Sequence, residues 1–314
     1  MVATTGLRRG RVSGASLFKW TLLAPLTALL LFLLPVFLLQ IYFSFHSWTI
    51  YLTSWWNAEF VWLAMFGEVL GDPRFHWAVV RSLVFAFTST VGCFAVGFGL
   101  ALLMHKPFRG HALFYSFFIL PMLTPPIVIA YTFEMLLYQK GPINGILSAV
   151  SGLDINVSWL ADPRIAVLTT VCLEIWNWTP FAFIIMLAGL SSLPPELAEA
   201  ARSLGASRWR IFLEVQLPLL RPVIVLVLVL RFLEAVGEFP KVWALFQGGP
   251  GTVTETIPVY IYLTTWSYFH ISKGAAMSYV VMLMMVVIVL FAIRLLRKEK
   301  RALDEMYQSE ESRA

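Results

Sequence analysis

The sequence has few charged residues and almost no cysteine for a chain of 314 residues. Charged residues make up 13% of it, whereas a soluble domain typically has about a quarter, and hydrophobic residues make up 59%. The mean hydropathy is +0.77, and several apolar runs are longer than a core helix needs to be. These features exclude an ordinary soluble domain and predict a chain embedded in a membrane.

The sequence also lacks the motifs of common enzymes. It has no G-x-x-x-x-G-K-[ST] phosphate loop, no H-E-x-x-H and no G-x-S-x-G. Cys93 and Cys172 each lie in an apolar run without His, Cys or carboxylate residues at ligand spacing. We therefore expect no catalytic residues, no metal site and no cofactor in this subunit. A membrane-embedded enzyme, and a channel or carrier that works without an ATPase, are the competing classes.

Six apolar segments are long enough to cross a bilayer, which needs about 20 residues. They are residues 18–45, 79–104, 111–138, 166–190, 219–242 and 276–296. The predicted fold is an all-α integral membrane protein with six transmembrane helices over residues 18–296. Residues 1–17 and 297–314 are predicted to be cytoplasmic tails. Prolines inside these segments predict kinks, above all at Pro125 and Pro126.

The positions of the basic residues predict the orientation of the chain. With both termini in the cytoplasm, sixteen of the 23 Lys and Arg residues fall on that side and six on the other. This bias follows the positive-inside rule. It also accounts for the net charge of +5 without a basic face, so we expect contact with membrane lipid and none with nucleic acid.

The cytoplasmic loop 193–222 has the pattern of two short helices. Pro194 and Pro195 can open a helix, Gly205 interrupts the pattern, and a second helix is predicted from Ala206 to Gln216, ended by Leu217 and Pro218. Such a protrusion can dock into a groove of a protein partner or lie on the lipid surface. The residues alone leave both interpretations open.

This segment closely resembles the EAA loop of binding-protein-dependent ABC importer permeases. The matching residues are Glu199, Ala200, Ala201, Gly205, Val215, Leu217 and Pro218. The family usually has Ile at the position of Val215. The resemblance implies that the loop is a coupling helix, which sits in a cleft of the nucleotide-binding subunit.

The resemblance extends over nearly the whole chain and narrows to carbohydrate-uptake permeases of the maltose-transporter type. Residues 119–126, 188–194 and 247–262 are similar to blocks of that group's first permease. It implies a complex in the bacterial inner membrane with a second permease subunit, two ATP-binding subunits that bind ATP and Mg²⁺, and an extracytoplasmic solute-binding protein. The implied function is import of a sugar-like solute by alternating access.

Polar residues inside the predicted spans are candidates for the solute path, because ionisable groups are costly in a bilayer. They are Glu174, Asn177, Trp178, Arg231, Glu234 and Glu238. Residues 231, 234 and 238 are spaced to share one helix face. The charged and amide groups can exchange hydrogen bonds with sugar hydroxyls, and Trp178 can stack on a sugar ring. The alternatives are helix packing for Trp178 and an internal ion pair between Arg231 and Glu234.

The solute itself stays open at this stage. Sugars, polyols and glycerol phosphates all suit a path with a few hydrogen-bonding groups. Several unpaired carboxylates would instead favour a cationic solute such as a polyamine.

Overall fold

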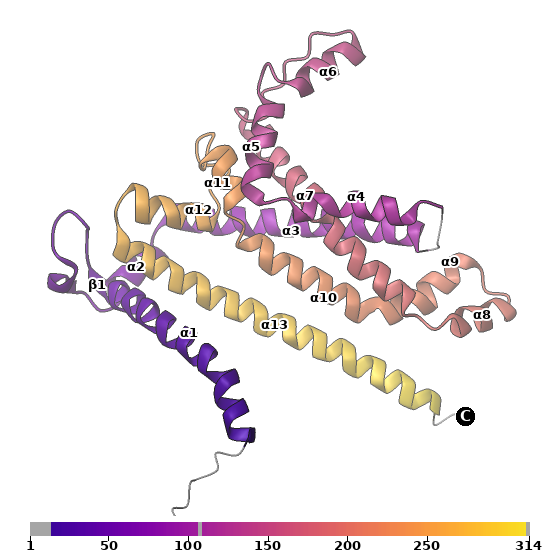
Figure 1. Ribbon diagram of the computed structural model, residues 1–314. Helices are drawn as coiled ribbons and strands as arrows, with labels where there is room; N and C mark the ends of the chain where they lie inside the picture. Colours follow the sequence, from indigo (N-terminus) through magenta and orange to yellow (C-terminus); the bar gives the residue numbers. More distant parts are fainter. Residues whose placement is uncertain (1–13, 106–108, 312–314) are drawn as a thin grey trace, which may run out of the picture.

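The computed structural model describes residues 14–105 and 109–311, and most of them are helical (Figure 1). Most of the predicted N-terminal tail, residues 1–13, lies outside the described residues. Within the described ranges the strands are β1 (His46–Ser47) and β2 (Glu59–Phe60), which pair in an antiparallel hairpin. The long helices are α1 (Gly14–Phe45), α3 (Pro73–Met104), α7 (Pro163–Ser191) and α13 (Ile271–Glu311).

Shorter helices connect or extend the long ones. They are α2 (Ala64–Leu70), α4 (His111–Leu123), α5 (Pro126–Leu137), α6 (Pro142–Ser151), α8 (Pro195–Ser203), α9 (Arg208–Ile211), α10 (Leu217–Val236), α11 (Pro240–Phe246) and α12 (Ile257–Tyr262). The 3-10 helix η1 covers Trp55–Asn57, and the π-helical turns η2 and η3 cover Phe212–Gln216 and Leu263–Ser267.

Four helices are long and apolar enough to cross a membrane on their own: Leu23–Phe45, Pro73–Met104, Pro163–Ser191 and Ile271–Arg294. Two of them begin at an Asp-Pro pair. Asp72 and Asp162 cap α3 and α7 by accepting hydrogen bonds from backbone N–H groups in the first turn. The proline that follows each of them suits the first helical position, where an N–H has no helical partner.

The predicted span 111–138 is broken in two, as its prolines indicated. Helices α4 and α5 are bent by 94° relative to each other and count as a fifth span if the pair is taken together. Pro125 and Pro126 have no N–H to continue the helix, and each disfavours a helical conformation of the residue before it.

The prediction of one continuous helix over 219–242 is wrong. Helix α10 ends at Val236, and Phe239, with φ −125° and ψ −52°, lies outside the helical region before α11 begins at Pro240. Pro240 disfavours a helical conformation at Phe239. By length and composition, the described residues contain four candidate spans, or five if α4 and α5 are taken as one span.

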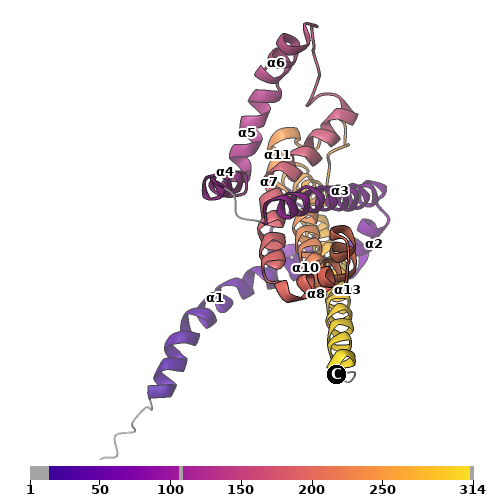
Figure 2. The same ribbon diagram turned by 90° about the vertical axis from the view of Figure 1, so that its right-hand side faces the viewer.

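The bundle is centred on the packing of α3 against α7. A Cβ atom on Gly97 would lie 2.8 Å from the Cβ of Ala182, so the two helices approach as closely as they do because residue 97 is glycine. Phe183, Met186, Leu220 and Val227 fill the adjoining core between α3, α7 and α10. The helices α5 and α6 project from the bundle (Figure 1), and α1 diverges from it toward its N-terminal end (Figure 2).

Candidate functional site: a helical protrusion and a buried polar cluster

The segment 193–222 forms the two short helices that its sequence predicts. Helix α8 ends in a Schellman motif, in which Ala206 N donates to Ala201 O at 3.0 Å and Gly205 N donates to Arg202 O at 2.9 Å. Gly205 has φ +82°, a left-handed conformation that favours glycine. Ser207 then caps α9 by accepting from Arg210 N at 3.3 Å. The glycine elbow is thus a defined turn between α8 and α9.

This protrusion (α8, α9 and the elbow between them) lies at one end of the bundle, beyond the end of α10 (Figure 1). Two of its large apolar side chains are not covered by the rest of the chain: Leu204 is 89% exposed and Trp209 is 69% exposed. Of the residues in the EAA-like pattern, Glu199, Ala200 and Gly205 are exposed, and the other four are partly buried: Ala201, Val215, Leu217 and Pro218.

The second helix does not end at Leu217 and Pro218, in contrast to the prediction. Helix α9 continues through η2 directly into α10, and Leu217 keeps helical angles. Proline at position 218 is tolerated because a π-helical turn precedes it and Pro218 lies in the first turn of α10. The protrusion is therefore joined to α10 without a break.

A cluster of buried polar side chains lies where α7 meets α10 and α11. Glu174 on α7 and Arg231 on α10 are each 1% exposed and form an ion pair. The second carboxylate oxygen of Glu174 lies 2.5 Å from Nζ of Lys241 on α11, which is 4% exposed. One carboxylate thus pairs with two buried cations, and a buried charge is tolerated away from water when it is paired in this way.

Lys241 is the member of this cluster that the sequence analysis missed, because it placed this lysine among the residues outside the spans. Its ammonium group lies 2.5 Å from Glu174 Oε2, donates to Asn177 Oδ1 at 2.8 Å and lies 3.4 Å from Glu238 Oε2. An ammonium group has three N–H donors, and it has three acceptors here. The i, i+3 spacing of Glu238 and Lys241 is the signal that could have identified it.

Asn177 connects the cluster to the bend between α4 and α5. Its Nδ2 donates to the backbone oxygen of Pro121 at 2.6 Å. In a continuous helix this oxygen would accept from residue 125, but Pro125 has no N–H. Thr124 N approaches the same oxygen at 3.3 Å, so Asn177 supplies the shorter of the two hydrogen bonds. The predicted path residue Asn177 therefore satisfies a carbonyl that the bend leaves without its helical partner.

The remaining predicted path residues surround Arg231. The guanidinium carbon of Arg231 lies 4.6 Å from the centre of a Trp178 ring, and its Nη1 donates to Glu234 at 3.3 Å. Glu234 is 45% exposed in this chain. Within the described part of the chain, Nε of Arg231 and Nε1 of Trp178 are buried without a hydrogen-bond partner. The Arg231 side of the cluster thus has two buried donors without a partner, whereas Nζ of Lys241 donates to Asn177.

The expectation that residues 231, 234 and 238 share one helix face is wrong for Glu238. Gly237 ends α10, and Glu238 lies in the following turn, where its carboxylate accepts from Lys241 N at 3.1 Å. The Arg231–Glu234 ion pair is present, but Glu174 is a second, fully buried partner of Arg231. All three carboxylates of the cluster therefore have a cationic partner.

A second polar network joins the segment 247–262 to the rest of the chain. Arg74 makes two hydrogen bonds to the buried Glu255, at 2.8 and 2.6 Å. Tyr260 donates to Asp72 at 2.6 Å, and Lys273 lies 3.0 Å from the same oxygen. Burial on its own would raise the pKa of Asp72. These hydrogen bonds and the charge of Lys273 outweigh burial and hold the pKa of Asp72 below its usual value. Burial and the hydrogen bond to Asp72 raise the pKa of Tyr260 to about 12.

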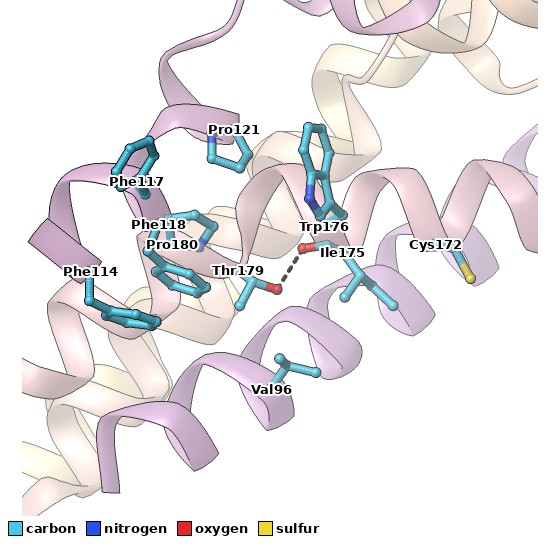
Figure 3. A pocket seen from close by; sticks show the side chains of 10 residues that line it. All are labelled: Val96, Phe114, Phe117, Phe118, Pro121, Cys172, Ile175, Trp176, Thr179 and Pro180. Atoms are coloured by element: carbon cyan, nitrogen blue, oxygen red, sulfur yellow. Dashed lines mark hydrogen bonds between the residues drawn. The ribbon is translucent and has the colours of Figure 1, made fainter. Parts of the chain in front are cut away.

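An apolar cavity of about 500 Å³ lies between α3, α4 and α7. Its wall includes Phe114, Phe117, Phe118, Pro121, Trp176 and Pro180, all drawn in Figure 3. The hydroxyl of Thr179 in this wall donates to Ile175 O at 2.6 Å (Figure 3), so it is already satisfied. A ligand with many hydroxyl groups would find few partners here, and we assign the polar chemistry to the cluster instead.

Comparisons with known proteins identify the class of this fold. Residues 94–301 match the family model described as binding-protein-dependent transport system inner membrane component. The sulfoquinovosyl glycerol transport system permease protein of Agrobacterium fabrum is 31% identical over 90% of this chain and 92% of that protein. The trehalose/maltose transport system permease protein of Thermococcus litoralis is 29% identical over 87% of this chain and 90% of that protein.

Solved structures give the same fold. One chain of a bacterial alginate ABC transporter, in complex with its alginate pentasaccharide-bound periplasmic protein, aligns with a TM-score of 0.73. The match covers 92% of this chain and 98% of the other, at 24% sequence identity. The polar cluster and the protrusion thus lie on a fold that is similar to that of an ABC transporter chain.

Proposed function

This chain belongs to the family of binding-protein-dependent transport system inner membrane components, and on that premise we propose that it forms part of the membrane path of a sugar importer. The observation that carries the proposal is its 29–31% identity, over most of each chain, to permeases named for trehalose, maltose and sulfoquinovosyl glycerol. In this proposal α10 and the turn after it form the fifth of the six predicted spans. The chain then crosses the membrane six times, and both termini lie in the cytoplasm.

The charges of the buried cluster favour a carbohydrate over a polyamine. A polyamine path would offer carboxylates that lack a cation, but Glu174, Glu234 and Glu238 are each within 3.4 Å of Arg231 or Lys241. A sugar needs a few hydrogen-bond partners and an aromatic face. Trp178, Glu234 and the unused Nε donor of Arg231 supply these on one side of the cluster. We assign the solute contacts to these three residues.

We assign energy coupling to the protrusion formed by α8 and α9. Its exposed Leu204 and Trp209 and its rigid connection to α10 suit docking into a groove of an ATP-binding subunit. Motion of that subunit would then be transmitted along α10 to Arg231 and Glu234. The complete transporter in this proposal has a second permease, two subunits that bind ATP and Mg²⁺, and an extracytoplasmic binding protein. Transport proceeds by alternating access.

The experiment is to purify the complex with its ATP-binding subunits and binding protein in lipid. ATP hydrolysis is then recorded with a panel of disaccharides, oligosaccharides, sulfonated sugars, polyols, glycerol phosphates and polyamines. We expect one carbohydrate to stimulate hydrolysis, and only when the binding protein is present. Stimulation by a polyamine alone, or hydrolysis that no solute changes, would overturn the sugar assignment.

A further inference from the structure

Lys241 lies between the two broken helices of the membrane region. Helix α10 is separated from α11 at residues 237–239, and Lys241 is the second residue of α11. Helices α4 and α5 are separated at Thr124 and Pro125 and bent by 94°. Both breaks interrupt the backbone hydrogen bonds of a helix, and irregular backbone within a membrane is tolerated where other groups satisfy it.

A single chain of polar contacts joins these two breaks across α7. Lys241 Nζ donates to Asn177 Oδ1 at 2.8 Å, and Asn177 Nδ2 donates to Pro121 O at 2.6 Å, at the end of α4. The same ammonium group lies 2.5 Å from Glu174 and 3.4 Å from Glu238. The ammonium group thus lies among three oxygen atoms of this chain, two from carboxylates and one from the Asn177 amide, to which it donates.

We propose that Lys241 is a positioning residue for transport, which ties the break between α10 and α11 to the break between α4 and α5 through Asn177. This inference rests on the proposed function and deepens it by dividing the cluster in two. The Arg231 side, with Trp178 and Glu234, contacts the solute. The Lys241 side fixes the relative positions of two helix breaks and so transmits the movement of α10 to α4 and α5.

The test uses the assembled complex in lipid nanodiscs, with Cys172 replaced by serine and the buried Cys93 retained. Spin labels are attached at Leu113→Cys on α4 and Met135→Cys on α5, two positions that are 66% and 75% exposed in this chain. The distance between the two labels, obtained by electron–electron distance measurement, reports the bend between these helices. We expect Lys241→Met to broaden this distance distribution and Lys241→Arg to restore most of it. The matched control is Lys273→Met. Lys273 also bridges two carboxylates, Glu68 and Asp72, but it belongs to the network around Asp72 and not to the buried cluster. This control should leave the distance unchanged.

Uptake kinetics supply the second readout, assayed with the solute that the wild-type complex transports. Lys241→Met should lower the maximal rate at least about fivefold, with the half-saturating solute concentration changed less than about twofold. Trp178→Ala should instead raise that concentration. If Lys241→Met raises the half-saturating concentration as Trp178→Ala does, or leaves the label distances as in the wild type, the positioning role is wrong.

A variant that fails to assemble does not end the test. Asn177→Leu leaves the contacts of Lys241 with Glu174 and Glu238 in place and removes the two hydrogen bonds of Asn177, one from Lys241 and one to Pro121. It should broaden the same distance distribution, and an unchanged distribution would overturn the proposal. The distances do not depend on the identity of the solute. A wild-type complex that transports no sugar would therefore contradict the proposed function while the positioning role is still measured.

Discussion

The protrusion formed by α8 and α9 and the buried polar cluster are organised in opposite ways. The protrusion has local structure from its own sequence, a Schellman turn and two capped helices, and it leaves large apolar side chains such as Leu204 and Trp209 exposed. The cluster is held together by contacts between residues 57 to 67 positions apart, and Glu174, Arg231 and Lys241 are almost fully buried. The protrusion leaves apolar side chains that the rest of the chain does not cover, whereas the charged groups of the cluster are paired within the chain.

The largest effect is expected from Glu174→Gln in the cluster. The change leaves Arg231 and Lys241 buried without their shared counter-charge, and breaking a buried ion pair costs about 3–5 kcal/mol. The free energy of unfolding, measured by denaturant titration in mixed micelles, should fall by that order. Glu214→Gln is the control, since it removes an ion pair to Arg210 in which both side chains are about two-thirds exposed. A surface pair contributes roughly 0–1 kcal/mol, so equal losses in the two variants would contradict this contrast.

A smaller effect on a different property is expected from Trp209→Ala in the protrusion. A buried tryptophan at a protein interface typically contributes about 2 kcal/mol or more to binding. The permease should therefore bind its ATP-binding subunit roughly thirtyfold more weakly, with unfolding of the permease itself unchanged. Binding can be measured by titrating the ATP-binding subunit onto immobilised permease. Trp56→Ala, 64% exposed in the loop between β1 and β2, is the matched variant and should bind as the wild type does.

Gly205→Val tests the shape of the elbow. A Cβ atom at this position meets nothing within 4 Å, so the cost comes from the left-handed backbone angles, about 1–2 kcal/mol for a residue with a side chain. Uptake per ATP hydrolysed should fall about fivefold or more. Gly152→Val imposes the same kind of strain, at φ +68° and without close neighbours, after α6. If uptake per ATP hydrolysed fell in both variants, or in neither, the elbow at Gly205 would have no specific role in coupling.

The smallest effect is expected from the pH dependence of the Asp72 network. Because the folded-state pKa of Asp72 lies below its usual value of 3.8, its stabilisation is present above that value and is lost as pH falls through the folded pKa. Tyr260, with a pKa of about 12, keeps its proton and its hydrogen bond to Asp72 throughout this range. Thermal unfolding from pH 3 to 7 should therefore show a steeper acid loss in the wild type than in Asp72→Asn. Parallel curves would contradict the role of this carboxylate.

The same contrast explains what could be predicted from the sequence. The protrusion could be predicted because glycine at 205 and prolines at 194 and 195 determine the backbone conformation of the residues next to them. The bend at Pro125 follows from the same local rule. The contacts Asn177–Pro121 and Glu174–Lys241 could not be predicted, because they join helices whose relative positions depend on the whole bundle. The break at Gly237 was missed, although Gly237 and Pro240 are local signals of the same kind as Pro125.

The central claim is that the cluster selects the solute while the protrusion couples its movement to ATP hydrolysis. The most direct test is binding-protein-dependent uptake into proteoliposomes, measured across solute concentrations for the wild type, Trp178→Ala and Gly205→Val. The account predicts a higher half-saturating concentration for Trp178→Ala, and a lower maximal rate at an unchanged half-saturating concentration for Gly205→Val. If both variants changed the same kinetic constant, the division between the two regions would be contradicted.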